Sequence, residues 1–165
     1  MHESTYRKFT ALNLQPYSAT ELVEAIPQKP PFWFINKILS VDENCIEGIY
    51  TFKPTEFFYQ GHFPGNPLTL GVILLESMTQ VDLVASRLYL LSKEIARNEV
   101  MNLVPLFTDE NVEFFSPIKP TDMITIRAKE TLWRRKKLKS HAKTHKADGT
   151  LVGIAELGGI GVKNL

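Results

Sequence analysis

Residues 71–91 constrain the fold of this chain more than any other segment. Apolar side chains recur there three and four residues apart, which predicts an α-helix. Further apolar residues widen the stripe almost all the way round, and a helix that is apolar on nearly every side is buried. These residues are Val72, Ile73, Leu74, Leu75, Met78, Val81, Leu83, Val84, Ala85, Leu88, Tyr89 and Leu90. Because the stretch also carries Glu76, Gln80, Asp82 and Arg87, we interpret it as a core helix and not as a membrane span.

The rest of the chain supplies the layer that covers this helix. Alternating patterns and turn signals predict strands on both sides of it. The predicted strands cover residues 32–41, 45–52, 103–108 with 111–115 (one bulged strand or two), 123–133, 138–145 and 151–162. An antiparallel sheet needs only one covered face, so the predicted class is α+β, one long helix on a curled antiparallel sheet. We expect residues 1–165 to form one domain, with residues 1–20 as an N-terminal extension.

Shorter signals predict the connections. A helix over residues 20–26 follows Ser18 or Thr20 as cap and ends at Pro27. Residues 42–44 and 147–150 are predicted hairpin turns, the second through its Asp-Gly step. Residues 53–69 form a long loop, and long loops inside a domain are usually functional.

Composition is that of an ordinary globular protein, because 44% of the 165 residues are hydrophobic and 22% are charged. The single cysteine, Cys45, excludes an internal disulfide and favours a reducing, cytoplasmic compartment. Since Cys45 lies in a predicted strand, we interpret it as a small buried residue. The first residues lack the continuous apolar segment of a secretory signal.

Charge is distributed unevenly. Residues 131–147 hold seven of the 19 Lys and Arg and no Asp or Glu, which leaves 12 basic against 18 acidic side chains elsewhere. This basic run is either a surface for a polyanion or a solvated strand edge protected by lysines. It lacks the interleaved aromatic residues of nucleic-acid binding, so we expect no nucleic-acid partner. His141 and His145 lie on its lysine face, where a cation would be repelled, so we expect no metal.

His62 and Glu76 are the candidate catalytic residues. Pro64 and Gly65 restrict the backbone beside His62, which a solvated loop would not need. Glu76 lies about one and a half turns into the predicted helix, where loss of water favours a protonated, usable acid. Gly71 marks the helix start, whose free N–H groups favour a negatively charged oxygen. A base, an acid and a helix-end amide describe a site for proton transfer next to a carbonyl.

Both residues also have a structural interpretation. A single loop histidine is more often solvated or structural than catalytic. Glu76 could instead pair with Gln80, four residues further along, or with a buried Arg87.

Residues 61–80, GHFPGNPLTLGVILLESMTQ, resemble the signature of the 3-hydroxyacyl-[acyl-carrier-protein] dehydratases of type II fatty acid synthesis. That pattern runs roughly G-H-F-P-x-x-P-x-x-P-G-V-x-x-x-E-x-x-x-Q, and the spacing of fourteen residues from His62 to Glu76 matches it. Residues 26–38 and 110–126 look like two further motifs of the family, so the resemblance covers most of the chain. It implies the hotdog fold, in which an antiparallel sheet wraps a long helix.

The resemblance also implies an activity. His62 would remove a proton from C2 of a (3R)-3-hydroxyacyl thioester and Glu76 would protonate the departing 3-hydroxyl, which gives the trans-2-enoyl product. The substrate-binding residues would be Gly71, whose N–H polarises the thioester carbonyl, with Val72, Phe63, Pro67 and Gln80. No cofactor is implied. The implied partners are an acyl carrier protein that carries the chain and a second copy of the enzyme, because family members are homodimers, some assembled as trimers of dimers, that share each site between subunits. Glutamate at the acid position favours simple dehydration over dehydration with isomerisation.

The sequence departs from the family pattern at four positions. Leu70 stands in place of a proline, Gln28 and Lys29 in place of His-Arg, and Asn36 in place of Asp. We expect none of them to touch the two proton carriers, and together they indicate a branch outside housekeeping fatty acid synthesis.

Several alternatives stay open. The chain could be a hotdog acyl thioesterase or a non-catalytic acyl-binding subunit. The basic run is one place for an acidic carrier protein to dock. The aromatic residues of the loop either line an acyl tunnel or belong to the core; they are Phe57, Phe58, Tyr59 and Phe63.

Overall fold

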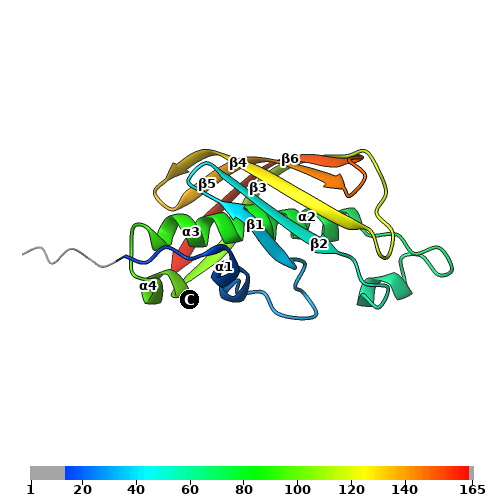
Figure 1. The fold of residues 1–165 in the computed structure, drawn as a ribbon, viewed down its shortest axis with the longest axis horizontal. Helices are drawn as coiled ribbons and strands as arrows, with labels where there is room; N and C mark the ends of the chain where they lie inside the picture. The colour runs from blue at the N-terminus through cyan, green and yellow to red at the C-terminus, as the bar shows by residue number, and fades with distance from the viewer. Residues whose placement is uncertain (1–13, 164–165) are drawn as a thin grey trace, which may run out of the picture.

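One long helical rod lies against the inner face of a six-stranded antiparallel sheet (Figure 1). The computed structural model describes residues 14–163. The strands are β1 (Lys37–Val41), β2 (Cys45–Thr51), β3 (Leu103–Phe114), β4 (Met123–Arg134), β5 (Lys137–Lys146) and β6 (Leu151–Lys163), in the sheet order β1-β2-β4-β5-β6-β3. The helices are α1 (Ala19–Ala25), η1 (Phe57–Gln60), α2 (Gly71–Thr79), η2 (Gln80–Ala85), α3 (Ser86–Ser92) and α4 (Arg97–Met101). The predicted α+β class and the single helix under a curled sheet are confirmed.

The predicted central helix is present but is not α-helical throughout. Its middle segment, η2, is a π-helix, so α2 and α3 are joined by a wider turn. Two fully buried polar side chains lie in this segment, Gln80 and Asp82, and both bind groups outside the helix. π-Helical turns inside α-helices are frequently found at functional sites.

The first predicted strand begins later than expected. We predicted residues 32–41, whereas β1 begins at Lys37. The backbone of residues 32–34 bonds to helix side chains instead of a neighbouring strand: Gln80 binds the carbonyl of Phe32 and the N–H of Phe34, and Ser77 donates to the carbonyl of Phe34. These residues therefore tie the chain to the helix before the sheet starts.

The predicted hairpins are confirmed. Asp42 accepts hydrogen bonds from the N–H groups of Asn44 and Cys45, and Gly149 adopts the positive φ, +87°, that its turn requires. Residues 103–114 form one strand, with a bulge between Phe107 and Asp109. Cys45 is half-buried, so it is less enclosed than we predicted.

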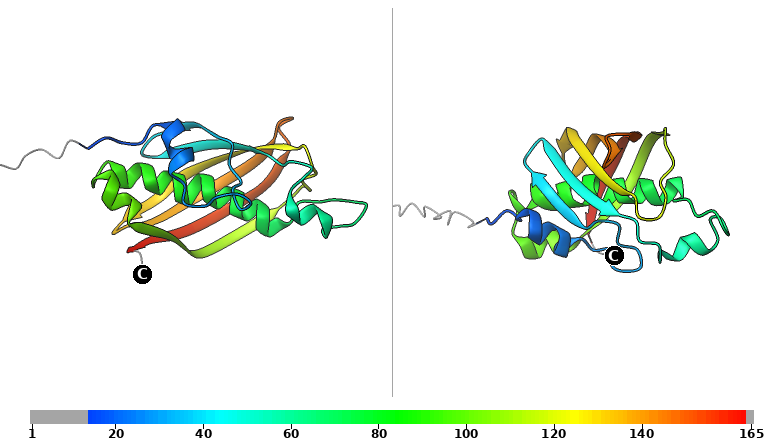
Figure 2. Two further views of the ribbon diagram at one scale, coloured as in Figure 1. Left: turned by 90° about the horizontal axis from the view of Figure 1, so that it is seen from below. Right: turned by 45° about the vertical axis from the view of Figure 1, so that its right-hand side comes forward.

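Strand β3 lies at the free edge of the sheet beside β6, as Figure 2 shows in its left panel. Several large apolar side chains on and after this strand are exposed: Leu106, Phe107, Phe114 and Phe115. An apolar, unpaired edge strand is a surface that another chain can cover.

The N-terminal extension is partly attached to the body. Ser18 caps α1 in a capping box with Glu21. Arg97 of α4 lies over the Tyr17 ring and binds both the carbonyl of Pro16 and the carboxylate of Glu21. Residues 1–13 of the predicted extension lie outside the described residues. No helix in the described range 14–163 is long and apolar enough to cross a membrane.

Candidate active site

His62 is held in a small closed loop that follows η1. Phe63 and Asn66 exchange backbone hydrogen bonds of 2.9 and 3.3 Å across Pro64 and Gly65. Proline at the second position and glycine with φ +76° at the third are what a type II turn requires. Outside this turn, the N–H of Leu68 donates to the carbonyl of His62 at 2.9 Å. The local sequence therefore fixes the backbone of His62.

The imidazole of His62 is oriented by the same loop. Its Nδ1 lies 2.8 Å from the carbonyl oxygen of Leu68. A carbonyl can only accept, so Nδ1 carries the hydrogen and Nε2 of the neutral ring keeps a free lone pair. The ring is half-buried and stacks on Phe63, whose centroid lies 4.1 Å away. This arrangement presents Nε2 as a proton acceptor.

The start of α2 offers free backbone donors. Leu70 is its N-cap and makes no side-chain capping bond, and within residues 14–163 no acceptor binds the N–H groups of Gly71 and Val72. The ring of Phe114 covers the Cα of Gly71, because a Cβ there would lie 2.9 Å from Phe114 Cε2. Glycine at this position thus lets the strand β3 and the helix start approach closely.

Glu76 lies half-buried on α2. Burial raises the pKa of its carboxyl, and side-chain hydrogen bonds from Gln80 and Gln28 offset part of that rise. Both amides reach the same oxygen, Oε1: Gln80 Nε2 at 2.9 Å and Gln28 Nε2 at 3.4 Å. The environment favours a carboxyl that keeps its proton more readily than a solvated one.

Gln80 is completely buried, and all of its amide group is engaged. Its Oε1 accepts the N–H of Phe34 at 2.8 Å, and its Nε2 donates to the carbonyl of Phe32 and to Glu76. Its side-chain hydrogen bonds among residues 14–163 are thus with Glu76 and with the backbone of Phe32 and Phe34. The pairing of Glu76 with Gln80 that the sequence suggested is present, while Arg87 faces Gly161 of β6 instead.

One expectation about the departures from the family pattern is wrong. We expected Gln28 to touch neither proton carrier, yet its amide contacts Glu76. The two residues are 48 positions apart, and they meet because the chain after α1 folds back beneath α2. No local pattern in the sequence signals this contact.

The structure brings some of the predicted site residues together and leaves others apart. Glu76 and Gln80 are in contact, and Gly71 opens the same helix. No hydrogen bond or ion pair joins His62 to Glu76 within residues 14–163. The remaining predicted binding residues line the loop and helix start: Val72 and Phe63 are 68% and 51% exposed, and Pro67 is half-buried. Within the described residues, His62 and Glu76 therefore have separate hydrogen-bond partners, Leu68 for the first and Gln80 with Gln28 for the second.

A second buried acid lies further along the same helix, and sequence reasoning did not single it out. Asp82 is fully buried, accepts a hydrogen bond from Ser140 of β5 through Oδ2, and has no partner for Oδ1 in the described part of the chain. Burial, reinforced by the nearby Glu130 carboxylate and opposed by Ser140, raises its pKa to about 7. The aromatic residues of the loop divide between core and surface: Phe58 and Tyr59 are buried, whereas Phe57 and Phe63 are exposed.

Comparison with known proteins identifies the family. Residues 26–156 match the family model of the FabA-like domain. The chain belongs to the FabA-like family. It is 32% identical over 139 residues to the 3-hydroxyacyl-[acyl-carrier-protein] dehydratase FabZ of Geotalea uraniireducens, covering 83% of this chain and 91% of that one. It is 30% identical to FabZ of Bartonella bacilliformis over 92% of this chain and 95% of that one.

Solved structures confirm the hotdog fold of this FabA-like chain. The dehydratase heterocomplex ApeI:P of Xenorhabdus doucetiae superposes with a TM-score of 0.72 at 13% identity, covering 90% of this chain and 93% of that one. A mutant thioesterase of Pseudomonas aeruginosa gives a TM-score of 0.66 at 14% identity over 91% and 97% of the two chains. Hotdog proteins of different activities thus share the arrangement, and the fold alone does not select among them.

Proposed function

We propose that this protein dehydrates a (3R)-3-hydroxyacyl chain on an acyl carrier protein to the trans-2-enoyl thioester, in fatty acid or related acyl-chain biosynthesis. The observation that carries the proposal is the match to FabZ dehydratases over most of the chain. The thioesterase match extends to the fold alone, at 14% identity. We assign the reaction to the cytoplasm, because a chain with a single cysteine suits a reducing compartment.

His62 is the general base in this proposal. Its free Nε2 takes the proton from C2 of the thioester, while the Nδ1–H bond to Leu68 holds the ring and steadies the imidazolium that forms. The electron pair left at C2 spreads onto the thioester carbonyl oxygen. The free N–H of Gly71, at the positive end of α2, is the donor that we assign to this oxygen, where it would stabilise the developing negative charge. Val72, Phe63 and Pro67 form the adjoining wall for the acyl chain and its thioester arm.

Glu76 is the general acid. As the C3–O bond breaks, its proton passes to the departing hydroxyl, which leaves as water, and the C2–C3 double bond forms from the electron pair released at C2. The raised pKa of Glu76 supports this role, because the acid must hold its proton until the hydroxyl departs. His62 and Glu76 then return to their starting states by exchange with solvent.

We further propose that the working unit is a homodimer in which His62 of one chain meets Glu76 of the other. Two features support it: no hydrogen bond joins His62 to Glu76 among residues 14–163, and strand β3 presents an exposed apolar edge. A two-fold dimer would supply the missing component twice, once for each site.

The first test follows the conjugated enoyl thioester by its ultraviolet absorbance, starting from 3-hydroxyacyl carrier protein. We expect turnover by wild type and a loss of about 10²–10⁴-fold in His62→Ala. Thiol release without enoyl product would instead identify a thioesterase, and binding without either product would identify a non-catalytic acyl-binding subunit.

Mixing two inactive variants tests the shared site. Refolding His62→Ala together with Glu76→Gln gives mixed dimers in which one site carries both substitutions and the other carries neither. We expect the mixture to recover about a quarter of wild-type activity under random pairing. If base and acid belong to one chain, every site in the mixture keeps a defect and activity does not return.

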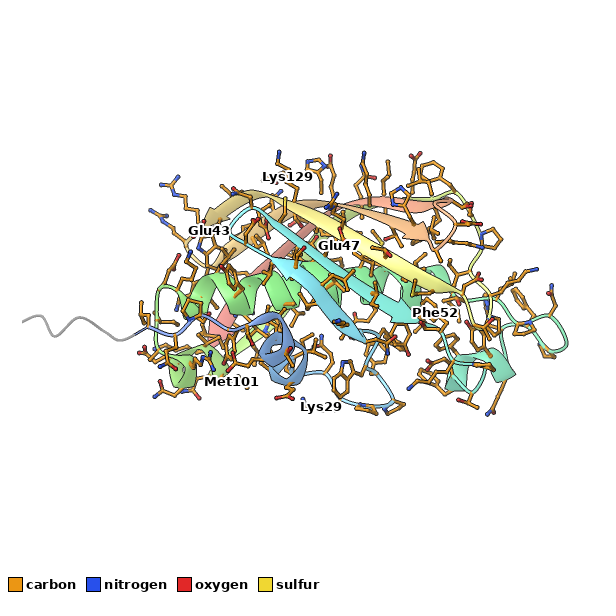
Figure 3. The ribbon with its side chains drawn as sticks, viewed as in Figure 1. Lys29, Glu43, Glu47, Phe52, Met101 and Lys129 are labelled. Carbon is orange, nitrogen blue, oxygen red and sulfur yellow. The ribbon has the colours of Figure 1, made fainter. Side chains whose placement is uncertain are left out.

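The basic run offers a docking surface for the acidic carrier protein. Part of it is already paired, since Lys137 and Lys139 lie 3.8 and 3.1 Å from the Asp109 carboxylate. The turn between β4 and β5 is different: Arg134, Arg135 and Lys136 are exposed and make no ion pair with residues 14–163. Side chains of the outer sheet face, Lys129 among them, project away from the helix (Figure 3). We propose that the turn attracts the carrier protein.

Charge reversal of this turn tests the docking surface. The turn lies at the opposite end of the molecule from the loop of His62 (Figure 1), so we expect steering and not a direct effect on chemistry. Replacing Arg134, Arg135 and Lys136 by Glu should raise KM for the carrier-bound substrate several-fold and leave kcat unchanged, with a smaller effect at high salt. An unchanged KM at low salt would remove the turn from the docking surface.

A further inference from the structure

The segment that follows α1 reaches the proposed acid directly. Gln28 comes immediately after Pro27, is half-buried, and places Nε2 3.4 Å from Glu76 Oε1. Within residues 14–163, it is the one side chain outside the central helix that hydrogen-bonds this carboxyl. The contact therefore links the start of the chain to the chemistry on α2.

The two amides that meet Glu76 are held differently. Gln80 is fixed by the backbone of residues 32–34, as described above. Gln28 has no such support: its Oε1 is shut off from solvent and has no partner in the described part of the chain. A buried acceptor without a partner destabilises the folded state, and an apolar side chain would fill the same space without this cost. If Gln28 only filled space in the fold, there would be no reason for a polar amide at this position.

Both amides approach the same oxygen of the carboxyl. An N–H donor stabilises an oxygen that carries negative charge and is a poor neighbour for an acidic proton. With two donors at Oε1, the transferable proton resides on Oε2, which makes no hydrogen bond with residues 14–163. After the proton has left, the same two donors stabilise the carboxylate.

We propose that Gln28 is a positioning residue for Glu76, whose amide joins that of Gln80 in holding Oε1 and so leaves Oε2 to carry the proton to the substrate. The proposal rests on the proposed function for its kinetic consequence, although the contact itself does not. It assigns part of the acid's behaviour to the segment between α1 and β1.

Among the described residues, the nearby charged side chains face other groups, so they do not account for the pKa of Glu76 in place of the two amides. On the helix itself, Asp82 is turned to Ser140 and Arg87 faces Gly161. Lys29, the residue after Gln28, donates to the backbone carbonyls of Glu24 and Ile26. Figure 3 labels its side chain. The ring of His62 is bound to Leu68. The pKa of Glu76 responds to burial first and then to the two amides.

Three variants test the proposal through the pH dependence of kcat/KM. Gln28→Met keeps the volume and removes the donor, Gln28→Glu places a second acid beside Glu76, and Lys29→Met changes the neighbouring residue as a control. Activity needs protonated Glu76, so it is lost as pH rises through the pKa of that group. We expect this high-pH limb to move up by about half a pH unit in Gln28→Met and by about one unit or more in Gln28→Glu. Lys29→Met should leave it in place.

A second readout separates the failure of this proposal from the failure of the proposed function. The carboxyl carbon of Glu76, assigned by its loss in Glu76→Gln, is titrated by NMR in the resting protein and needs no turnover. The same order of midpoints, wild type below Gln28→Met below Gln28→Glu, supports the positioning role even if no enoyl product forms. Unchanged midpoints, or an equal loss of activity at every pH without a shift of the limb, would overturn it.

Discussion

Glu76 and Asp82 are two acidic residues on one helix, six residues apart. They differ in how far their carboxyl groups are exposed to solvent. Burial raises the pKa of both. Glu76 is half-buried, is approached by two amide donors, and keeps one oxygen without a hydrogen bond in residues 14–163. Asp82 is sealed between the helix and β5, with Ser140 as its hydrogen-bond partner. A raised pKa thus identifies a buried carboxyl, and access to substrate separates a proposed acid from a structural one.

The largest effect that we expect is on dehydration activity, and it tests whether Glu76 and not Asp82 is the acid. Glu76→Gln should lower dehydration about 10²–10⁴-fold while the protein stays folded, because the amide cannot donate an acidic proton. Asp82→Asn, the matched change on the same helix, should keep activity close to that of wild type. Enoyl absorbance measured side by side on the two variants decides the assignment. Loss of turnover in Asp82→Asn with an intact fold would contradict it.

The next effect concerns stability. The native pKa of Asp82 is about 7, against 3.8 for the solvated group, so between about pH 4 and pH 7 the folded state holds a proton that the unfolded state has released. The free energy of unfolding therefore falls as pH rises through this window and then levels off. Asp82→Asn removes this dependence. The free energy of unfolding of the variant minus that of wild type should therefore increase by on the order of 2 kcal/mol between pH 5 and pH 8.

Urea unfolding of both proteins at pH 5 and pH 8 measures this difference. Glu76→Gln serves as its control, since Glu76 is only half-buried and should show a smaller pH-dependent gain. Equal pH dependence in wild type and Asp82→Asn would mean that Asp82 is ionised in the folded protein at neutral pH.

The smallest effect that we expect comes from removing the hydrogen bond between Ser140 and the buried Asp82. Ser140→Ala removes the donor that lowers the pKa of Asp82, so the pKa should rise further. We expect a loss of about 1 kcal/mol in the free energy of unfolding and a shift of the levelling-off point to higher pH, with kcat unchanged. A fall in kcat that matches that of Glu76→Gln would connect the two acids functionally.

Local sequence was a good guide wherever neighbours along the chain determine the geometry. Pro64 and Gly65 specify the type II turn beside His62, and the pairing of Glu76 with Gln80 follows from one helical turn. Local patterns failed at residues 32–34, where side chains of the helix take the backbone groups that a strand would have used. They also missed η1 and α4, which are too short to show a clear period.

The buried helix, the antiparallel class, the family and the spacing of His62 and Glu76 could all be predicted from the amino-acid sequence, because each shows in residues close together in the chain. Three other features could be seen only in the folded chain: Gln28 contacts Glu76, Asp82 is buried against Ser140, and β3 lies at the free edge of the sheet. These outcomes depend on which distant segments pack together, and packing alone decides which polar groups lose water and which partners they find instead.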